Sequence, residues 1–226
     1  MGKFDGILIC SDIDGTILQN SQFDGIFEKN AAAVKYFTDN GGRFTFITGR
    51  YKFFLSEMPL YPLINAPAGI FNGAAVYDCE TDTVLYARHI EHTCDELADT
   101  VNDFRSHFVR SIYPTDTEEN EVTSVFGDLP EQLYGKKPLK CAHVFDSEQI
   151  ALEFKKMLLN DSRFDDCCIT RSWNIAVELT SALATKGHAA RYIKELTGSH
   201  TLVTIGDYEN DIPMLEMADI GAAVGS

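Results

Sequence analysis

The hydrophobic residues in the first third of the chain alternate between strand-like and helical spacing. Residues 6–10 form an apolar run bounded by polar residues, which is typical of a buried strand. Residues 26–40 carry apolar side chains at helical spacing, and Gly41 and Gly42 predict the end of that helix. The next segments are a strand, a short helix and a strand, predicted at residues 43–48, 51–57 and 68–72. This order predicts a parallel α/β sheet.

From about residue 76 the rhythm changes. Two short apolar pieces on either side of a polar turn predict a hairpin, at residues 76–77 and 84–87. Residues 111–138 are acidic and rich in turn-forming residues. The remaining helices and strands expected here lie at residues 91–104, 139–145, 147–159, 168–170 and 175–179. This mixture predicts an α+β insert at residues 81–183.

The α/β rhythm resumes after the insert. The helices and strands expected in this part lie at residues 187–196, 201–205, 210–218 and 220–224. The sequence therefore predicts a discontinuous α/β core with a parallel sheet, formed by residues 1–80 and 184–226, with the α+β insert between its two halves.

The chain of 226 residues is strongly acidic. Its 34 aspartates and glutamates outnumber its 19 lysines and arginines, which gives a formal net charge of −15. Such a charge repels nucleic acid and anionic membrane surfaces, so neither is expected as a partner. It would equally repel a phosphorylated substrate. A site for an anion in this chain therefore needs a metal ion or a well-placed lysine or arginine.

The cysteines and the N-terminal segment predict a cytoplasmic protein. The six cysteines form no C-x-x-C pair, and Cys167 and Cys168 are adjacent, which suits neither a zinc knuckle nor a disulfide. We expect reduced thiols, as in the cytoplasm. The apolar run at residues 6–10 is too short for a signal peptide or a membrane span.

Two aspartates, Asp12 and Asp14, directly follow the first predicted strand. Alternation places their side chains on the same side of an extended segment, and Gly15 allows a tight turn after them. Two carboxylates this close do not ionise equally, so a metal ion could keep one ionised while the other stays protonated. The pair indicates a nucleophile beside a general acid. An ordinary loop is the alternative, and a calcium loop is disfavoured because Phe23 stands where its last glutamate ligand would be.

Two further groups stand after a strand and at the start of a helix. Thr48, Gly49 and Arg50 follow the second strand, where a hydroxyl and a backbone turn can donate hydrogen bonds to a phosphate oxygen. A simple turn is the alternative reading of this triplet. Lys186 opens the helix after the insert, where the helix dipole disfavours a cation. Its position indicates a nearby anion, unless the lysine simply lies on the surface.

An acidic segment follows the strand at residues 201–205. Asp207 stands at the end of that strand as Asp12 does in the first, and Asn210 and Asp211 begin the next helix. Oxygen ligands of this kind suit a hard cation, above all Mg²⁺, whereas helix capping is the alternative. Because the carboxyl ends of parallel strands meet at one edge, these groups are expected to converge. Mg²⁺ and Lys186 would then supply the positive charge that the acidic chain otherwise lacks.

Taken in order, these segments resemble the motifs of the haloacid dehalogenase-like (HAD) hydrolase superfamily, specifically the Cof-type sugar phosphatases of subfamily IIB. The matching segments are residues 12–16, 48–50, 72–74, 186–187 and 206–211, and the resemblance spans almost the whole chain. It implies a Rossmann-like, HAD-like core in residues 1–80 and 184–226, and an α+β cap of type C2B in residues 81–183. The cap would close over the site and select the leaving group.

The resemblance also implies roles for the acidic residues. Asp12 would attack phosphorus and form an aspartyl-phosphate. Asp14 would protonate the leaving alcohol and then activate water. Mg²⁺ would be held by Asp12, the backbone carbonyl of Asp14 and Asp207, with Asp211 as a further ligand or as a partner of the ligands.

Four other residues would surround the phosphoryl group bound at Asp12. Thr48, Gly49 and Lys186 would bind its oxygens, and Lys186 would also steady Asp12. Asn210 would contribute to this site by orienting the acidic cluster. Phosphoryl transfer depends mostly on positioning and charge stabilisation, which these residues would provide.

The expected function is hydrolysis of a small phosphorylated metabolite such as a sugar phosphate, with the oligomeric state left open. A phosphomutase is the nearest alternative, but it would need extra cations in the cap, where Lys136 and Lys137 form the one obvious cluster. A non-catalytic protein of HAD fold would be expected to have lost at least one of the key charged residues, and none is lost.

The sequence ends at residues 221–226, where members of the family usually continue through a further helix and strand. We therefore expect either a shortened core or an incomplete chain. The motifs that would carry the chemistry lie before this point.

Overall fold

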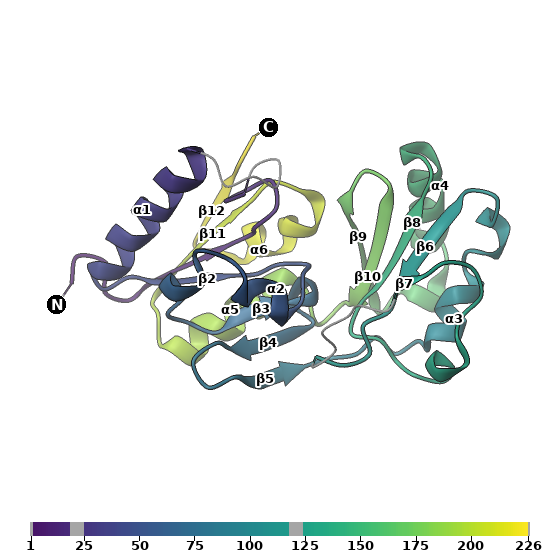
Figure 1. The fold of residues 1–226 in the computed structure, drawn as a ribbon, viewed down its shortest axis with the longest axis horizontal. Coiled ribbons are helices and arrows are strands. Elements are labelled where there is room, and N and C mark those ends of the chain that lie inside the picture. Colours follow the sequence, from purple (N-terminus) through teal and green to yellow (C-terminus); the bar gives the residue numbers. More distant parts are fainter. Residues whose placement is uncertain (1, 19–24, 118–123, 226) are drawn as a thin grey trace. The chain divides into compact units, whose positions relative to one another are not determined.

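The computed structural model describes residues 2–18, 25–117 and 124–225, and the chain divides into two compact units. Unit 1 consists of Met1–Tyr86 and Thr185–Ser226, and unit 2 of Ala87–Ala184 (Figure 1). The division falls a few residues after the expected boundary at residue 80, because β5 (Thr83–Ala87) shares a sheet with two earlier strands. Phe23, on which the argument against a calcium loop depended, lies outside the described residues.

The centre of unit 1 is a four-stranded parallel sheet in the order β12-β11-β1-β2. Its strands are β1 (Ile7–Ser11), β2 (Arg43–Phe46), β11 (Thr201–Gly206) and β12 (Ile220–Ala223). Cys10 of β1 lies opposite Thr45 on one side and Thr204 on the other. The first apolar run is thus an inner strand, with Leu8 and Cys10 fully buried. The parallel α/β sheet predicted from the sequence is confirmed.

The described residues of unit 1 also form four α-helices, α1 (Gly25–Asp39), α2 (Lys52–Ser56), α5 (Lys186–Thr197) and α6 (Ile212–Met217). The helix after the insert, α5, begins where Thr185 accepts a hydrogen bond from the His188 N–H. It ends at Gly198, whose φ of 63° is a left-handed conformation that glycine adopts without strain. Ile193 of α5 packs in one buried cluster with Leu8 of β1, so α5 is attached to the sheet and its first residue has a defined position.

One predicted strand of the parallel sheet belongs to a different sheet. β3 (Ala68–Ile70) touches the parallel sheet through a bridge from Gly69 to Ile47, but pairs antiparallel with β4 (Ala75–Asp78), next to which lies β5. The reversal occurs in the 3₁₀ turn η3 (Phe71–Gly73), where all three residues have positive φ. Asparagine followed by glycine tolerates such a turn, and the chain reverses before the predicted strand would end.

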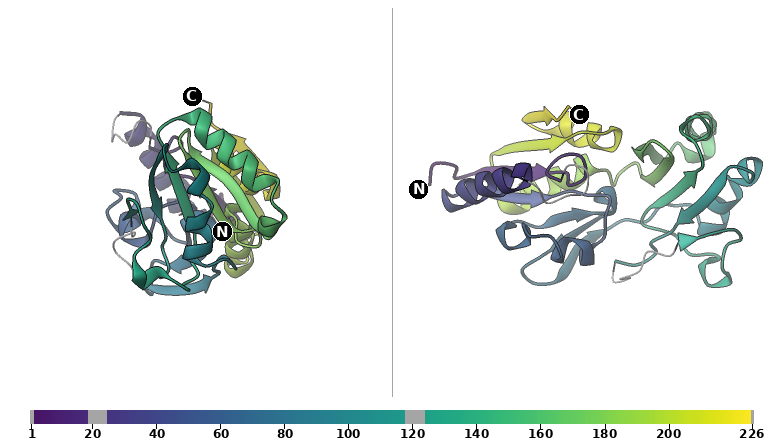
Figure 2. Two further views of the ribbon diagram at one scale, coloured as in Figure 1. Left: turned by 90° about the vertical axis from the view of Figure 1, so that its right-hand side faces the viewer. Right: turned by 45° about the horizontal axis from the view of Figure 1, so that its top comes forward.

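Unit 2 is built around a five-stranded antiparallel sheet in the order β7-β6-β8-β10-β9. Its strands are β6 (Phe108–Ile112), β7 (Ser124–Val125), β8 (Cys141–Phe145), β9 (Cys167–Trp173) and β10 (Ala176–Ser181). Its α-helices are α3 (Cys94–Asp99) and α4 (Glu148–Leu159), and α4 lies along the sheet (Figure 2, left). Unit 2 is therefore an α+β structure.

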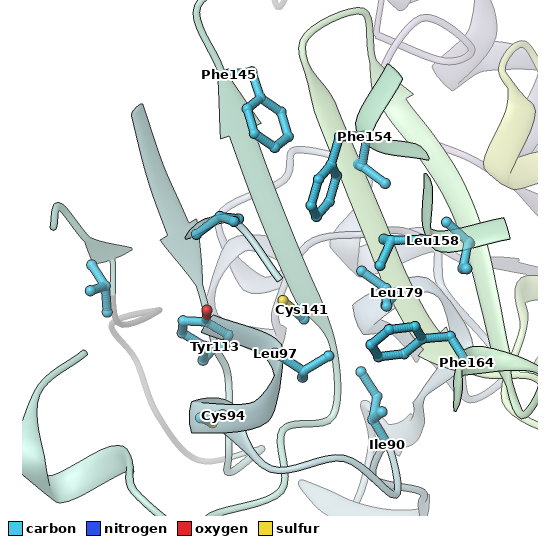
Figure 3. Close-up of a cluster of buried hydrophobic side chains, with 14 of the residues drawn as sticks. Ile90, Cys94, Leu97, Tyr113, Cys141, Phe145, Phe154, Leu158, Phe164 and Leu179 are labelled. Atoms are coloured by element: carbon cyan, nitrogen blue, oxygen red, sulfur yellow. The ribbon is translucent and has the colours of Figure 1, made fainter. Parts of the chain in front are cut away.

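The core of unit 2 lies between the sheet and the two helices (Figure 3). Phe154 of α4 is fully buried, and its ring lies 4.8 Å from that of Phe145 on β8. Leu97 of α3 and Tyr113, which follows β6, belong to the same cluster. Both helices therefore cover the sheet with large apolar side chains, and their burial supplies the main stabilisation of this unit.

The segment at 91–104 forms a shorter helix than its hydrophobic spacing predicts. A capping box between Thr93 and Glu96 starts α3, and Thr100 ends it while its hydroxyl donates to the Leu97 carbonyl. The remaining 3₁₀ helices are η2 (Tyr61–Leu63), η4 (Asn102–Phe104), η5 (Glu131–Leu133), η6 (Ser162–Phe164) and η7 (Glu209–Asp211). Within the described ranges, none of the helices combines the length and the apolar character that crossing a membrane requires.

Candidate active site

Three strand ends meet at one edge of the parallel sheet. Asp12 follows β1, and its backbone N–H donates to the Ile205 carbonyl of β11 at 2.9 Å. The N–H of Ile47, which follows β2, donates to the Ser11 carbonyl of β1 at 2.9 Å. Because the three strands run parallel, Asp12, Thr48 and the segment after β11 emerge together at their carboxyl ends.

Lys186 lies at the centre of this edge and is fully buried. Its Nζ donates to Asp12 Oδ1 and to Asp211 Oδ1, each at 2.6 Å. Lys186 is the first residue of α5, so the anions expected near this lysine are the carboxylates of two other segments. Gly187 allows α5 to pack closely against the first turn of α6, because a Cβ at this position would collide with the Pro213 carbonyl. Asp12, Lys186 and Asp211, which are far apart in the sequence, thus form one buried cluster.

Burial and charge act in opposite directions on the titratable groups of this cluster. Burial raises the pKa of Asp12 to about 7, although the positive charge of Lys186 lowers it and the charge of Asp211 raises it further. Burial alone would lower the pKa of Lys186, but the carboxylates of Asp12 and Asp211 outweigh this and raise it. Partial burial also raises the pKa of Asp207. Burial thus disfavours the ionised form of Asp12, and the charge of Lys186 favours it.

The carboxylate of Asp211 organises the turn after β11. Its Oδ2 accepts hydrogen bonds from the backbone N–H groups of Asp207 and Tyr208, at 3.0 and 3.1 Å, while its Oδ1 accepts from Lys186. Gly206 lies against this side chain, where a Cβ would overlap it. With both oxygens occupied by donors, Asp211 is placed to orient Asp207 and Lys186.

Three carboxylates at this edge are close enough to share a cation. One oxygen each of Asp12, Asp207 and Asp211 lies within 4.8 Å of the others. The hydroxyl of Thr16 donates to Asp207 Oδ1 at 2.7 Å and holds that side chain in place. When ionised, the three carboxylates exceed the single charge of Lys186 by two negative charges. Hard oxygen donors with this excess charge fit a divalent ion such as Mg²⁺.

Asp14 does not join this buried cluster. Its side chain is 46% exposed, and both of its oxygens accept hydrogen bonds from the Arg50 guanidinium. Arg50 in turn lies over the ring of Phe54, 3.4 Å from its centroid. The chain leaves the extended conformation after Asp12 and turns at Gly15, which has a φ of 80°. Alternation along a strand therefore does not describe the relation between the two aspartates.

Thr48 is held between the second strand end and the η3 turn. Its side chain and backbone are buried, its Oγ1 accepts a hydrogen bond from the Arg50 N–H at 3.2 Å, and its carbonyl accepts from the Asn72 N–H at 2.8 Å. Asn210 Nδ2 donates to Asn72 Oδ1 at 3.2 Å. Asn72 thus connects the Thr48 turn to the acidic segment after β11. Gly49 lies within the Thr48 turn.

Sequence reasoning assigned no role to Thr16, Arg50 or Asn72, although all three stand in the matched segments. Their contacts connect residues that are far apart in the chain, and no local pattern reveals such contacts. Asn72 carries one readable signal, because an asparagine before a glycine favours the left-handed turn that it adopts here, with a φ of 59°.

The sequence profile of haloacid dehalogenase-like hydrolases matches residues 9–226, so the chain belongs to this family. It is similar to 5-amino-6-(5-phospho-D-ribitylamino)uracil phosphatase YcsE of Bacillus subtilis (strain 168), with 24% identity over 226 residues, 97% of this chain and 84% of that protein. It is also similar to YitU, a second 5-amino-6-(5-phospho-D-ribitylamino)uracil phosphatase of Bacillus subtilis (strain 168). The identity is 24% over 241 residues, 97% of this chain and 86% of that protein.

Among solved structures, the chain is similar to the HAD subclass IIB sugar phosphatase BT4131, with a TM-score of 0.77 and 22% identity. The match covers 96% of this chain and 86% of that one, and shows a common fold. Family and relatives together identify the chain as a phosphatase of the haloacid dehalogenase-like family.

Proposed function

We propose that this phosphatase is a Mg²⁺-dependent phosphomonoesterase that works through an aspartyl-phosphate on Asp12. The observation that carries the proposal is the buried contact of Lys186 with Asp12 and Asp211, beside the half-buried carboxylate of Asp207. A purely structural ion pair would balance its charges, whereas this cluster has an excess of carboxylates at the carboxyl edge of a parallel sheet. Such an arrangement suits a cation and a phosphoryl group bound together.

Asp12 is the proposed nucleophile. Lys186 orients its carboxylate through Oδ1 and favours the ionised form that attacks phosphorus. As the bond from an Asp12 oxygen to phosphorus forms, the bond from phosphorus to the leaving oxygen breaks. Asp14 gives its proton to that oxygen, so the alcohol leaves neutral. The partly exposed carboxyl of Asp14 can exchange protons with water between turnovers.

The second step returns the enzyme to its starting state. Asp14, now ionised, takes a proton from water as the water oxygen attacks phosphorus. The bond between phosphorus and Asp12 breaks, which releases inorganic phosphate and restores both side chains. Both oxygens of Asp14 accept from Arg50 in the structure, so one of these contacts opens when Asp14 carries the proton, and we infer that the other keeps this carboxyl near the edge of the sheet.

The proposed metal site uses the carboxylates of Asp12 and Asp207 and the backbone carbonyl of Asp14, while Asp211 either binds as well or orients the others. When bound, Mg²⁺ supplies positive charge that offsets the excess of carboxylates and stabilises charge on the phosphoryl oxygens. Thr16 contributes by fixing the Asp207 carboxylate.

The phosphoryl group of the substrate is proposed to lie between Asp12, the Thr48 turn and Lys186. Thr48 can donate through its hydroxyl, Gly49 through its backbone N–H, and Lys186 through its ammonium. Asn210 donates a hydrogen bond to Asn72, and this contact is proposed to keep the acidic segment after β11 in place beside the Thr48 turn. These donors provide positioning and charge stabilisation, which account for most of the catalysis of phosphoryl transfer.

The proposed substrate is a small phosphorylated metabolite with a sugar-like or polyol chain. The support is that one relative is named for a phosphoribityl compound and a structural neighbour for sugar phosphates. We also propose that unit 2 is the cap that selects the leaving group, and that the enzyme acts in the cytoplasm. All six cysteines are free thiols, in keeping with a reducing compartment.

The test is phosphate release from a panel of phosphorylated sugars, polyols and nucleotides, measured with Mg²⁺ and with EDTA. We expect release that requires Mg²⁺ and that is fastest with one class of sugar or polyol phosphate. Release that is indifferent to EDTA would contradict the metal proposal. Rearranged substrate without free phosphate, seen by ³¹P NMR, would indicate a mutase instead.

A further inference from the structure

A second group of potential metal ligands lies in unit 2. His92, Asp166 and Cys167 each offer one donor atom, and these three atoms lie within 4.8 Å of one another. The His92 side chain is 20% exposed and that of Asp166 46% exposed, so ions can reach the group from solvent. Figure 3 shows Ile90 and Cys94, which precede and follow His92 in the chain, inside the core of unit 2. The group therefore lies where the core of this unit meets solvent.

The distances between the donor atoms fit a tetrahedral metal site. His92 Nε2 lies 3.4 Å from Asp166 Oδ1, and Cys167 Sγ lies 3.6 Å from the same oxygen. With metal–ligand bonds of about 2.0–2.3 Å, two ligands of a tetrahedral zinc ion are separated by about 3.3–3.6 Å. Both of these separations lie in or at the edge of this interval, so a metal ion could be bound once the imidazole turns from the Arg163 carbonyl, which Nε2 contacts at 2.8 Å, toward Asp166 and Cys167.

The orientation of His92 is supported by groups around it. Glu96 Oε2 lies 3.6 Å from the other ring nitrogen, Nδ1, and the capping box with Thr93 holds that carboxylate in place. The imidazole ring also packs on Phe164, with ring centroids 4.7 Å apart. A carboxylate facing the second nitrogen is the usual partner of a metal-binding histidine, because it fixes the tautomer and the ring orientation.

We propose that His92 Nε2, Asp166 Oδ1 and Cys167 Sγ form a Zn²⁺ site in unit 2, with water as the fourth ligand. A set of imidazole, carboxylate and thiolate suits zinc better than Mg²⁺, which prefers oxygen alone. As the Zn–S bond forms, the thiol proton of Cys167 passes to solvent. The Nε2 proton, which His92 donates to the Arg163 carbonyl at 2.8 Å in the metal-free protein, is replaced by zinc, and Nδ1 carries the proton toward Glu96.

The bound ion would join two distant segments of unit 2. His92 precedes α3, whereas Cys167 begins β9 at the far end of the sheet order. A metal that binds the folded protein better than the unfolded chain raises the free energy of unfolding. This inference is independent of the proposed function, because it involves none of the residues at the edge of the parallel sheet.

The test is a Co²⁺ titration of the full chain in saturating Mg²⁺, followed by displacement with Zn²⁺. Cobalt bound to a thiolate has a charge-transfer absorption in the near ultraviolet, whereas cobalt at the acidic cluster of unit 1 lacks this band. We expect the band in the wild type and in Cys168→Ser, the control at the adjacent cysteine, and no band in Cys167→Ser. Zn²⁺ should abolish the band and raise the melting temperature of the wild type.

Two further variants distinguish metal binding at this site from binding by a single cysteine thiol. Glu96→Gln keeps the capping box but weakens the contact with Nδ1, and should lower metal affinity about 10–100-fold. Asp166→Asn should lower it at least about 10-fold and serves if Cys167→Ser does not fold. The proposal is overturned if folded wild type shows no band, if the band persists in Cys167→Ser, or if Cys168→Ser loses it.

Discussion

Both units bury a lysine against carboxylates, but the charges are arranged differently. In unit 2, Lys140 Nζ lies 2.9 Å from Glu178 Oε1, and the two side chains are 10% and 5% exposed. In unit 1, Lys186 contacts both Asp12 and Asp211 at 2.6 Å. The first contact joins one lysine to one carboxylate, whereas the second joins one lysine to two carboxylates. The difference is in keeping with the proposed function, in which the second carboxylate beside Lys186 helps to hold a ligand in unit 1.

The two units also bury a titratable group with opposite consequences. Burial lowers the pKa of His143 in unit 2 to about 3, where its ring contacts Ser111 Oγ at 2.7 Å and Cys141 Sγ at 3.2 Å. Burial raises the pKa of Asp12 in unit 1 to about 7. Both shifts favour the neutral form. A neutral imidazole suits a packed core, but a nucleophile must be ionised, so at Asp12 the proposed function opposes stability.

The largest expected effect is that of Asp12→Asn. The amide cannot attack phosphorus, so turnover should fall by at least about 10⁴-fold. It removes one buried negative charge while Lys186 keeps its contact with Asp211, so the free energy of unfolding should be unchanged or higher. Phosphate release and thermal unfolding measure the two effects. Activity close to that of the wild type would remove Asp12 as the nucleophile.

Asp14→Asn should reduce turnover about 10²–10⁴-fold with an alkyl phosphate, because the leaving oxygen then departs without a proton. With p-nitrophenyl phosphate the loss should be smaller, since that leaving group needs little protonation. The ratio of kcat for the two substrates is the measurement. Stability should hardly change, because the Asp14 side chain is partly exposed. An equal loss with both substrates would exclude Asp14 as the general acid.

Lys186→Met and Lys140→Met form a matched pair that tests the comparison of the two units directly. Each leaves carboxylates buried without their lysine, so each should lower the free energy of unfolding by about 3–5 kcal/mol. Lys186→Met should also lower turnover about 10²–10³-fold, whereas Lys140→Met should retain kcat in the folded fraction. Denaturant unfolding and kcat are measured for both. Comparable losses of kcat would show that the contrast drawn between the units is wrong.

The smallest expected effects are those of pH on stability, and the two buried groups should differ in sign. The folded-state pKa of His143 lies below its ordinary value of 6.5, so its contribution is present above pH 6.5 and is lost as pH falls toward 3. The folded-state pKa of Asp12 lies above its ordinary value of 3.8, so its contribution is present below pH 3.8 and is lost as pH rises toward 7.

The comparison uses metal-free protein in EDTA, and subtracts the stability of His143→Gln or Asp12→Asn from that of the wild type at each pH. The two differences should have slopes of opposite sign. Slopes of the same sign would show that burial does not govern both groups.

The fold was predictable where local sequence carries the physical cause. The apolar run before Asp12 became an inner strand because a parallel sheet covered on both faces needs apolar residues throughout. The helix before Gly198 ended where expected because glycine readily adopts the left-handed conformation there. The strand predicted at 68–72 was wrong in its last residues, because three positive φ angles at η3 are not visible in hydrophobic spacing.

By itself, the sequence determined the order of strands and helices, the motif residues at the strand ends and the net negative charge that led us to propose a bound cation. These follow from periodicity, turn chemistry and composition, which act over a few residues. The tertiary structure alone decided which charges meet. Lys186 contacts Asp12 across 174 positions, Arg50 binds Asp14, and His92 reaches Cys167. Such contacts depend on how the sheets bring distant segments together. Local sequence patterns contain no information about which distant segments become neighbours.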